Sequence, residues 1–359
     1  MSDIVVPKWV KKQWWKYLAV GLLIYVLIGG LAIPLSPGLD VVTPSFFYAD
    51  STTTFQLKGE NTHFKSGDNT QVFIKAGSQY FCVEEVQIVD EKTLLFSFSF
   101  NQITAEKNSD NNFDVIVNND EDGTIALRES LLLIDSESQD SSYVKQPCEV
   151  AVKNNLYQGF SFPYREILYE SIRNTFYHVP MWFGMQLILI LSLIYSIRYL
   201  RKGNLVDDVI ASQAVNVSLL CGVLGLLTGM IWANYTWGAP WTNDPKLNGA
   251  AVGVLIYFAY IVLRGAIQDP QKKARISAVY NVFALVVFVL FIFILPRITD
   301  SLHPGNGGNP AFSKYDLESN MRMFFYPAVI GWTLLFVWIL TICVRLRLLE
   351  LKKEENENE

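Results

Sequence analysis

Six long apolar blocks and one stretch of alternating apolar and polar residues form the hydrophobic pattern of this chain. The blocks run approximately over residues 17–35, 176–197, 214–233, 249–263, 277–295 and 324–344. A run of about 20 apolar residues is long enough to cross a bilayer as a helix. The pattern therefore predicts six transmembrane helices, of which the fourth is the shortest.

The alternating stretch lies between the first and second blocks, from about residue 40 to residue 157. Short runs of period two, separated by turn residues, occupy 54–58, 71–75, 85–89, 94–100 and 113–117. This period is typical of half-buried strands, and several strands at regular spacing indicate a β-sandwich. The predicted fold class is an all-α polytopic membrane protein with an all-β insert that resembles an immunoglobulin-like sandwich.

Four regions follow from these patterns. Residues 1–38 hold a basic lead and the first transmembrane helix, 39–160 the β insert, 161–346 helices two to six, and 347–359 a charged tail. Lysines precede the first block, as in a secretory signal, but prolines follow it rather than a small-x-small cleavage site. A retained helix is therefore predicted.

Basic residues are unevenly divided between the two sides of the predicted bundle. With six spans, one side receives the basic groups at 8–16, 198–202, 264–275 and 345–353, whereas the opposite loops hold few basic residues. Short loops rich in Lys and Arg stay in the cytoplasm. Both termini are thus predicted to be cytoplasmic, and the β insert, His178 and His303 to lie outside.

Composition and charge narrow the class of protein further. The chain is 51% hydrophobic and 18% charged, which is too apolar for an ordinary soluble domain, and its net charge of −5 argues against a nucleic-acid partner. Of its four cysteines, Cys82 and Cys148 lie in the β insert, where they form either a disulfide or two buried thiols. Cys221 and Cys343 lie in spans and are expected to serve packing. No C-x-x-C motif supports a redox role.

Residues 118–129 nearly fit the twelve-position calcium loop, with oxygen ligands at positions 1, 3, 5 and 12 and glycine at position 6. Position 1 is Asn118 rather than aspartate, and the flanks read as strands. The alternative is an Asp122-Gly123 turn that joins two strands of a hairpin. Calcium at Asn118–Glu129 is therefore the less favoured interpretation.

The candidate site comes from the loops on the predicted external side. The chain has three histidines, and His63 is read as a surface residue of the β insert. Pro180 suits the first turn of a helix, so His178 is expected at the outer mouth of the second span. His303 precedes a glycine-rich stretch that can fold back over the helix ends.

Between the third and fourth spans lies a short polar loop with Trp237, Trp241, Asp244 and Lys246. Two imidazoles can take the axial positions of a haem iron, and indole rings can stack on the porphyrin. Lys246 can pair with a propionate, as can Arg173, Arg297 and Arg322. The simpler alternatives are polar helix ends for the histidines, an aromatic belt at the lipid boundary for the tryptophans, and a helix N-cap for Asp244.

Three motifs carry a resemblance to a known family: Tyr177-His178-Val179-Pro180, the Trp237-Gly-x-x-Trp241-x-x-Asp244-x-Lys246-Leu247 loop, and Leu302-His303. They resemble the haem-handling proteins that carry a tryptophan-rich WWD loop flanked by two histidine loops. The chain is most similar to the haem exporter protein C (CcmC) type of the cytochrome c maturation system. The resemblance covers the first span and roughly residues 165–345, but not the β insert, which that type lacks.

The resemblance implies that His178 and His303 are axial iron ligands and that the Trp237–Lys246 loop is the haem platform. It implies haem, a haem chaperone, membrane lipid and the subunits of an ATP-driven transporter as partners. It also implies a location in a bacterial cytoplasmic membrane, with the insert in the periplasm.

This loop departs from the family pattern at four positions. The family's adjacent tryptophan pair is Pro240-Trp241 here, its tryptophan before the aspartate is Asn243, its arginine is Lys246, and its threonine after the leucine is Asn248. The platform is therefore less aromatic, and Lys246 would meet a propionate as a point charge rather than as a planar fork.

The expected function is haem binding on the external face of the membrane and haem delivery for cytochrome c maturation. One alternative is a component of a cytochrome c synthase that attaches haem directly. Histidines deep in the spans would favour the synthase, and the sequence has none there. An alternative of another class is a membrane-anchored adhesion or scaffold protein that acts through its β domain. No Ser–His–Asp set, phosphate loop or paired-carboxylate pattern is present, so a protein that is not an enzyme is expected.

Overall fold

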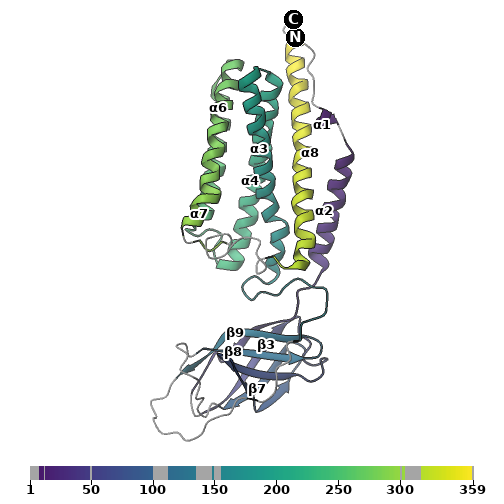
Figure 1. Cartoon of the computed structure of the whole chain (residues 1–359), viewed down its shortest axis with the longest axis vertical. Helices are drawn as coiled ribbons and strands as arrows, with labels where there is room; N and C mark the ends of the chain where they lie inside the picture. The colour runs from purple at the N-terminus through teal and green to yellow at the C-terminus, as the bar shows by residue number, and fades with distance from the viewer. Residues whose placement is uncertain are drawn as a thin grey trace. The chain divides into compact units, whose positions relative to one another are not determined.

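Helices and strands segregate into two units of the chain (Figure 1). The structure is a computed structural model that describes residues 8–11, 13–48, 51–99, 112–134, 148, 155–299, 301–303 and 317–357. The helical unit comprises Met1–Ala32 and Glu170–Glu359, and the β unit comprises Ile33–Tyr169. The β unit therefore begins before residue 39 and ends after residue 160, the limits expected from the sequence.

Six helices in the described part of the chain are long and apolar enough to cross a membrane, which confirms the six predicted spans. They are α2 (Trp14–Ala32), α3 (His178–Lys202), α4 (Leu205–Trp237), α5 (Pro245–Ala266), α6 (Pro270–Val289) and α8 (Ser319–Glu357). The shorter elements are α1 (Lys8–Lys11), the 3-10 helix η1 (Tyr169–Phe176), the π-helical η2 (Leu290–Ile294) and α7 (Leu295–Ile298). The fourth predicted span, the shortest apolar block, lies within the 22 residues of α5.

Polar residues and glycines set the helix ends. The side chains of Asn204, Asp244 and Asp269 accept hydrogen bonds from the first free N–H groups of α4, α5 and α6. Gly203 and Gly238 follow α3 and α4 with φ of 67° and 75°, a conformation that favours glycine. These signals keep the α3–α4 and α4–α5 connections short.

α3 packs along α4 and α2 packs along α8, and each of these two pairs is antiparallel (Figure 1). At one end, Trp9 Nε1 in α1 donates to Tyr195 in the C-terminal half of α3 at 3.0 Å, and Arg345 of α8 donates to the carbonyl of Val10. His178, the first residue of α3, therefore lies at the opposite end from α1. On the outside of the bundle, apolar side chains such as Leu255 and Phe283 are exposed, a surface suited to lipid.

The β unit contains two sheets. One has the strand order β1-β3-β7-β6 and the other β2-β9-β8-β4-β5. The first sheet is built from β1 (Gly38–Thr43), β3 (Thr52–Glu60), β6 (Glu85–Ile88) and β7 (Thr93–Ser99). The second is built from β2 (Phe46–Tyr48), β4 (Gln71–Ala76), β5 (Gln79–Cys82), β8 (Asn112–Asn119) and β9 (Gly123–Ile134). All pairs are antiparallel except β2 with β9, which is parallel.

Phenylalanines from both sheets form one core, so the unit is a sandwich. Phe47 of one sheet contacts Phe55 and Phe98 of the other with ring centroids 6.1 and 6.2 Å apart. In β7 every second side chain is buried, as its period of two predicts. The five strand runs expected from the sequence are found in β3, β4, β6, β7 and β8, although Val89 follows the end of β6 and Phe100 lies outside the described residues. The immunoglobulin-like identity stays a prediction.

Cys82 and Cys148 form a disulfide, with Cα atoms 5.7 Å apart. Of the two alternatives for this pair, the structure therefore has the disulfide. Cys148 also donates its N–H to the carbonyl of Tyr80 in β5. Cys221 is buried in the helical core and Cys343 is partly buried, in keeping with packing roles.

Candidate functional site

His178 lies against the C-terminal half of α4. Its Nδ1 is 3.1 Å from the hydroxyl of Thr228, and that hydroxyl donates to the carbonyl of Leu224 at 2.8 Å. Because Thr228 has a single hydroxyl proton, it acts as the acceptor toward His178. We therefore assign the ring the tautomer with hydrogen on Nδ1, which places the lone pair on Nε2.

Two glycines one turn apart on α4 make this approach possible. A Cβ placed on Gly229 would be 2.8 Å from Cε1 of His178, and one on Gly225 would be 2.9 Å from the ring of Trp182. Trp182 lies one turn after His178 on α3, with ring centroids 6.4 Å apart. The small residues let two rings of α3 pack directly on the backbone of α4.

His303 packs against two indoles at the end of the same helix α4. Its ring centroid is 5.7 Å from that of Trp232 and 4.9 Å from that of Trp237, and the two indoles contact each other at 5.0 Å. Trp232 follows Thr228 by four residues, a rise of about 6 Å along the helix axis. The two histidines therefore contact successive turns of α4, although they are 125 residues apart in the sequence.

Asp244 joins the beginning of α5 to the segment that carries His303. Its buried carboxylate accepts from the N–H groups of Lys246 and Leu247 as the N-cap of α5. It also accepts from the N–H of Leu302 at 2.8 Å and from the hydroxyl of Ser301 at 2.9 Å. Asp244 is thus the N-cap that the simpler alternative described, and the same side chain fixes the His303 segment.

His303 and Asp244 also contact each other, with His303 Nδ1 3.4 Å from a carboxylate oxygen. Burial lowers the pKa of His303 to about 4, with a further contribution from the charge of Lys246. Burial alone would raise the pKa of Asp244, but the hydrogen bonds from Leu302, Ser301 and Lys246 hold it below its usual range. At neutral pH a neutral imidazole therefore faces a carboxylate, and neutral imidazole is the form that binds iron.

The remaining loop residues form a small network of their own. Trp241 is 39% exposed, and its Nε1 donates to Asn248 Oδ1 at 3.3 Å. Asn248 in turn donates to Asn243 Oδ1 at 2.8 Å. Asn243 and Asn248 are two of the positions where this loop departs from the family pattern, so the departures are bonded to each other and hold the Trp241 indole.

The structure thus brings together His178, His303, Trp237 and Asp244 at the end of α4, with the charge of Lys246 close enough to act on both rings. Trp241 lies on the loop surface, and Trp232, which was not among the expected site residues, takes the place beside His303. Two of the other expected cations are engaged elsewhere: Arg173 donates to the carbonyl of Gly30, and Arg322 to that of Leu317. Arg297 is exposed at the end of α7.

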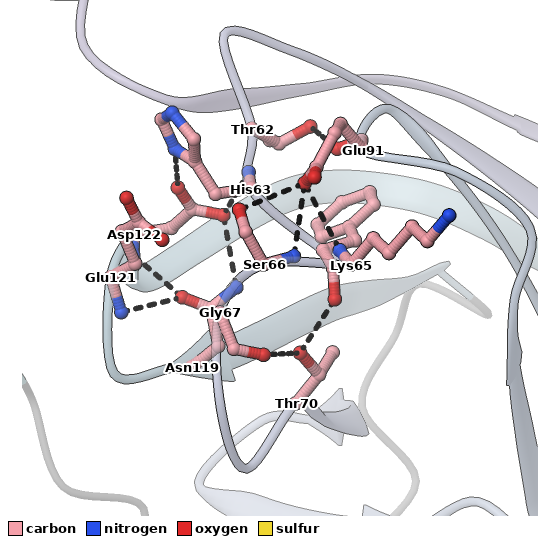
Figure 2. Close-up of polar contacts among 11 residues, drawn as sticks. Thr62, His63, Lys65, Ser66, Gly67, Thr70, Glu91, Asn119, Glu121 and Asp122 are labelled. Carbon is pink, nitrogen blue, oxygen red and sulfur yellow. Dashed lines mark hydrogen bonds and ion pairs between the residues drawn. The ribbon is translucent and has the colours of Figure 1, made fainter.

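The calcium-like segment is the β8–β9 hairpin, in which Asn119 pairs with Gly123. The Asn119 side chain accepts from the N–H groups of Glu121 and Asp122 and so forms the turn. Asp122 accepts from Asn119 and from both the backbone N–H and the ring of His63. Both carboxylate oxygens of Asp122 therefore accept hydrogen bonds within the protein, as expected for the hairpin turn rather than for a calcium loop (Figure 2). Among the described residues no group of three or more His, Cys, Asp or Glu side chains is arranged to hold a metal ion.

Figure 2 shows His63 bonded through one ring nitrogen to Asp122, with the other nitrogen turned away. The hydrogen bond that the His63 ring donates to the Asp122 carboxylate raises the pKa of His63. Because the pKa of His63 is higher in the folded than in the unfolded protein, the His63–Asp122 pair stabilises the fold fully at pH values below the unfolded-state pKa, near 6.5. This stabilisation is lost as the pH rises through the folded-state pKa. We therefore expect amides in residues 61–70 of the full-length protein to be several-fold better protected at pH 5.5 than at pH 8.5.

Hydrogen exchange by mass spectrometry, corrected for intrinsic rates, measures this difference. His63→Gln, which keeps a donor but does not titrate, should show equal protection at both pH values. Equal protection in the unmodified protein would contradict the expectation.

The family model described as "Heme exporter protein C" matches residues 142–359. A protein of Paracoccus denitrificans named "Heme exporter protein C" is 27% identical over 178 residues, which cover 49% of this chain and 72% of that protein. A protein of the same name from Rhodobacter capsulatus is 26% identical over 191 residues, covering 52% and 77%. "Cytochrome c biogenesis protein CcsA" of Prochlorococcus marinus is 31% identical over 88 residues, covering 24% of this chain and 28% of that protein.

Proposed function

The chain belongs to the haem exporter protein C family, and from this premise we propose that it binds haem through His178 and His303 and delivers it for cytochrome c maturation. The observation that carries the proposal is the approach of these two histidines to successive turns of α4. Both imidazoles come from one end of the bundle, where together they would hold the iron of a haem.

The residues around the histidines fit such a ligand. Burial keeps His303 neutral, and Thr228 leaves the Nε2 lone pair of His178 available. Trp232 and Trp237 form an apolar wall beside His303, and the exposed indole of Trp241 offers a face for stacking. Lys246 supplies a cation for a propionate. Bound there, haem is cargo, and the protein holds and orients it without chemical change, so the protein acts as a carrier rather than an enzyme.

The site faces the periplasm in this proposal. The end of the bundle opposite the site carries α1 and the C-terminal half of α8, whose basic residues favour the cytoplasmic side. The chain leaves the helical unit after Ala32 and returns at Glu170. Arg173 contacts the carbonyl of Gly30 near that break. The chain therefore leaves and re-enters the helical unit at one end of the bundle, which this proposal assigns to the periplasmic side. We propose a haem chaperone and an ATP-driven transporter as the partners of this delivery.

A role in a cytochrome c synthase is the second candidate, because an 88-residue segment is similar to the cytochrome c biogenesis protein CcsA. Haem attachment by the protein itself, with haem passing through the bundle, would call for histidines along the spans. His178 begins α3, His303 follows α7 and His63 lies in the β unit, so all three histidines of the sequence lie outside the middle of the spans. Delivery is therefore favoured.

Spectroscopy of the detergent-purified, full-length protein tests the proposal. After expression with haem available or reconstitution with ferric haem, we expect a Soret band and the low-spin spectrum of iron with two histidine ligands. A protein that binds no haem under either condition, or binds it with a high-spin spectrum throughout, would contradict the proposal.

Gly229→Ala is expected to lower haem occupancy without unfolding the bundle. The added Cβ would be 2.8 Å from Cε1 of His178, so the ring must leave its place beside Thr228. Gly21→Ala is the matched control, because a Cβ on Gly21 meets nothing within 4 Å. A displaced ligand reduces metal affinity by about 10–100-fold, by analogy with loss of a supporting partner. Haem titration of both variants measures the difference, and equal affinities would show that the position of His178 is unimportant.

A further inference from the structure

The two histidines of the proposed haem site have different partners at Nδ1. His178 has a neutral hydroxyl, that of Thr228, at 3.1 Å. His303 has a carboxylate, that of Asp244, at 3.4 Å. When one ring nitrogen of a histidine binds a metal, the group that contacts the second ring nitrogen changes how strongly the histidine donates electrons to the metal. The two partners are therefore a source of asymmetry between otherwise identical ligands.

On the His178 side the partner is weak. The hydroxyl of Thr228 directs its own proton to the carbonyl of Leu224 at 2.8 Å, so only an uncharged lone pair faces the ring. The carbonyl of Gly225 also interacts with this ring, and it is uncharged as well. Neither group stabilises positive charge on the imidazole as a carboxylate does.

The partner of His303 is the negatively charged carboxylate of Asp244, which is fixed in position by hydrogen bonds. The Asp244 carboxylate is held by the N–H groups of Lys246, Leu247 and Leu302 and by the hydroxyl of Ser301. Its side chain is 2% exposed and that of His303 is 15% exposed, so solvent screens their contact little. The 3.4 Å contact is an ion-pair contact and does not have hydrogen-bond geometry. The carboxylate therefore acts on the ring through its charge, which in this buried setting stabilises the positive charge that builds up on an imidazole when it donates electrons to a metal.

We propose that the two histidines bind the haem iron with unequal strength. His303, whose ring contacts Asp244, is the stronger ligand and stays bound, and His178, whose ring contacts Thr228, is the ligand that dissociates first when haem is transferred. This inference rests on the proposed function and deepens it. An acceptor with its own imidazole or another neutral donor would displace His178, while His303 retains the cargo until transfer is complete. Asp244 and Thr228 are then positioning residues that act through the histidines.

Resonance Raman spectroscopy of the full-length ferrous protein tests this asymmetry, because the iron–histidine stretch of five-coordinate haem reports the donor strength of the remaining histidine. His178→Ala leaves His303 as the ligand, and His303→Ala leaves His178. We expect a higher stretching frequency in His178→Ala than in His303→Ala. Adding Asp244→Asn to His178→Ala should lower that frequency, whereas adding Thr228→Val should leave it unchanged. Asparagine caps helices about as well as aspartate, so the Asn change removes the charge while it keeps the fold.

A further measurement follows ligand loss in the unmodified protein. Carbon monoxide added to ferrous protein should displace His178, so that the spectrum of the complex matches that of His178→Ala rather than that of His303→Ala. Equal iron–histidine frequencies, a higher frequency in His303→Ala, or no effect of Asp244→Asn would overturn the inference while haem binding stands. Absence of a Soret band from the unmodified protein would instead overturn the proposed function.

Discussion

Replacement of both His178 and His303 by alanine is expected to abolish haem binding by the purified protein. Both side chains contact the end of α4, and no other histidine of the chain lies in the helical unit. Without either imidazole, only the indoles and Lys246 remain to hold the porphyrin. Loss of metal ligation removes the main attachment, so the Soret band should disappear at haem concentrations that saturate the unmodified protein.

The third histidine supplies the matched control. His63 belongs to the β unit, where it is bonded to Asp122, and His63→Ala should leave the haem spectrum unchanged. The single variants should retain haem with one histidine ligand and a changed spin state. Haem content of the double variant equal to that of the unmodified protein would remove both the delivery and the synthase proposals.

The tryptophans of the site show how much of its structure the sequence pattern predicts. The loop was expected to begin at Trp237, but α4 continues to that residue, because Gly238 and not an earlier residue ends the helix. Trp237 therefore lies over Trp232 on the last turns of α4, and both rings contact His303. The helix end was misplaced because an apolar block marks the lipid-spanning part of a helix and not its full length.

The contact between His178 and Thr228 could not be predicted in the same way, because it depends on how α3 is aligned along α4. Nothing local to residues 177–180 identifies Thr228, which lies 50 positions away. A signal was nevertheless present, since Gly225 and Gly229 have the spacing at which helices pack closely. That spacing marks the face of α4 that receives a neighbour, but it does not say which helix or which side chain arrives.

Asp244 illustrates the opposite case, in which two interpretations of one residue are compatible. The sequence left open whether it belongs to the site or caps the following helix. The structure shows the cap, and it shows the same carboxylate 3.4 Å from His303. The cap was predictable from the Asp-Pro pair before an apolar run, whereas the bonds to Ser301 and Leu302 require the fold to bring the end of α7 to the beginning of α5.

Asp244→Ala is accordingly expected to cost both stability and haem. Loss of the N-cap costs about 1 kcal/mol. The N–H of Leu302 and the hydroxyl of Ser301 also lose their acceptor, and a buried donor left unsatisfied costs roughly 1–3 kcal/mol. The segment that carries His303 is then released from α5, so hydrogen exchange should rise in peptides covering 245–249 and 301–303, and haem affinity should fall by about 10–100-fold.

Asp269→Ala is the matched control for the cap alone. Asp269 is exposed and accepts from the N–H of Lys272 as the N-cap of α6, away from the histidines. Its loss should cost about 1 kcal/mol and leave haem affinity unchanged. Thermal unfolding monitored with haem titration separates the two outcomes. If the two variants lose the same stability and both retain full haem affinity, Asp244 is only a helix cap and the His303 segment is held by other contacts.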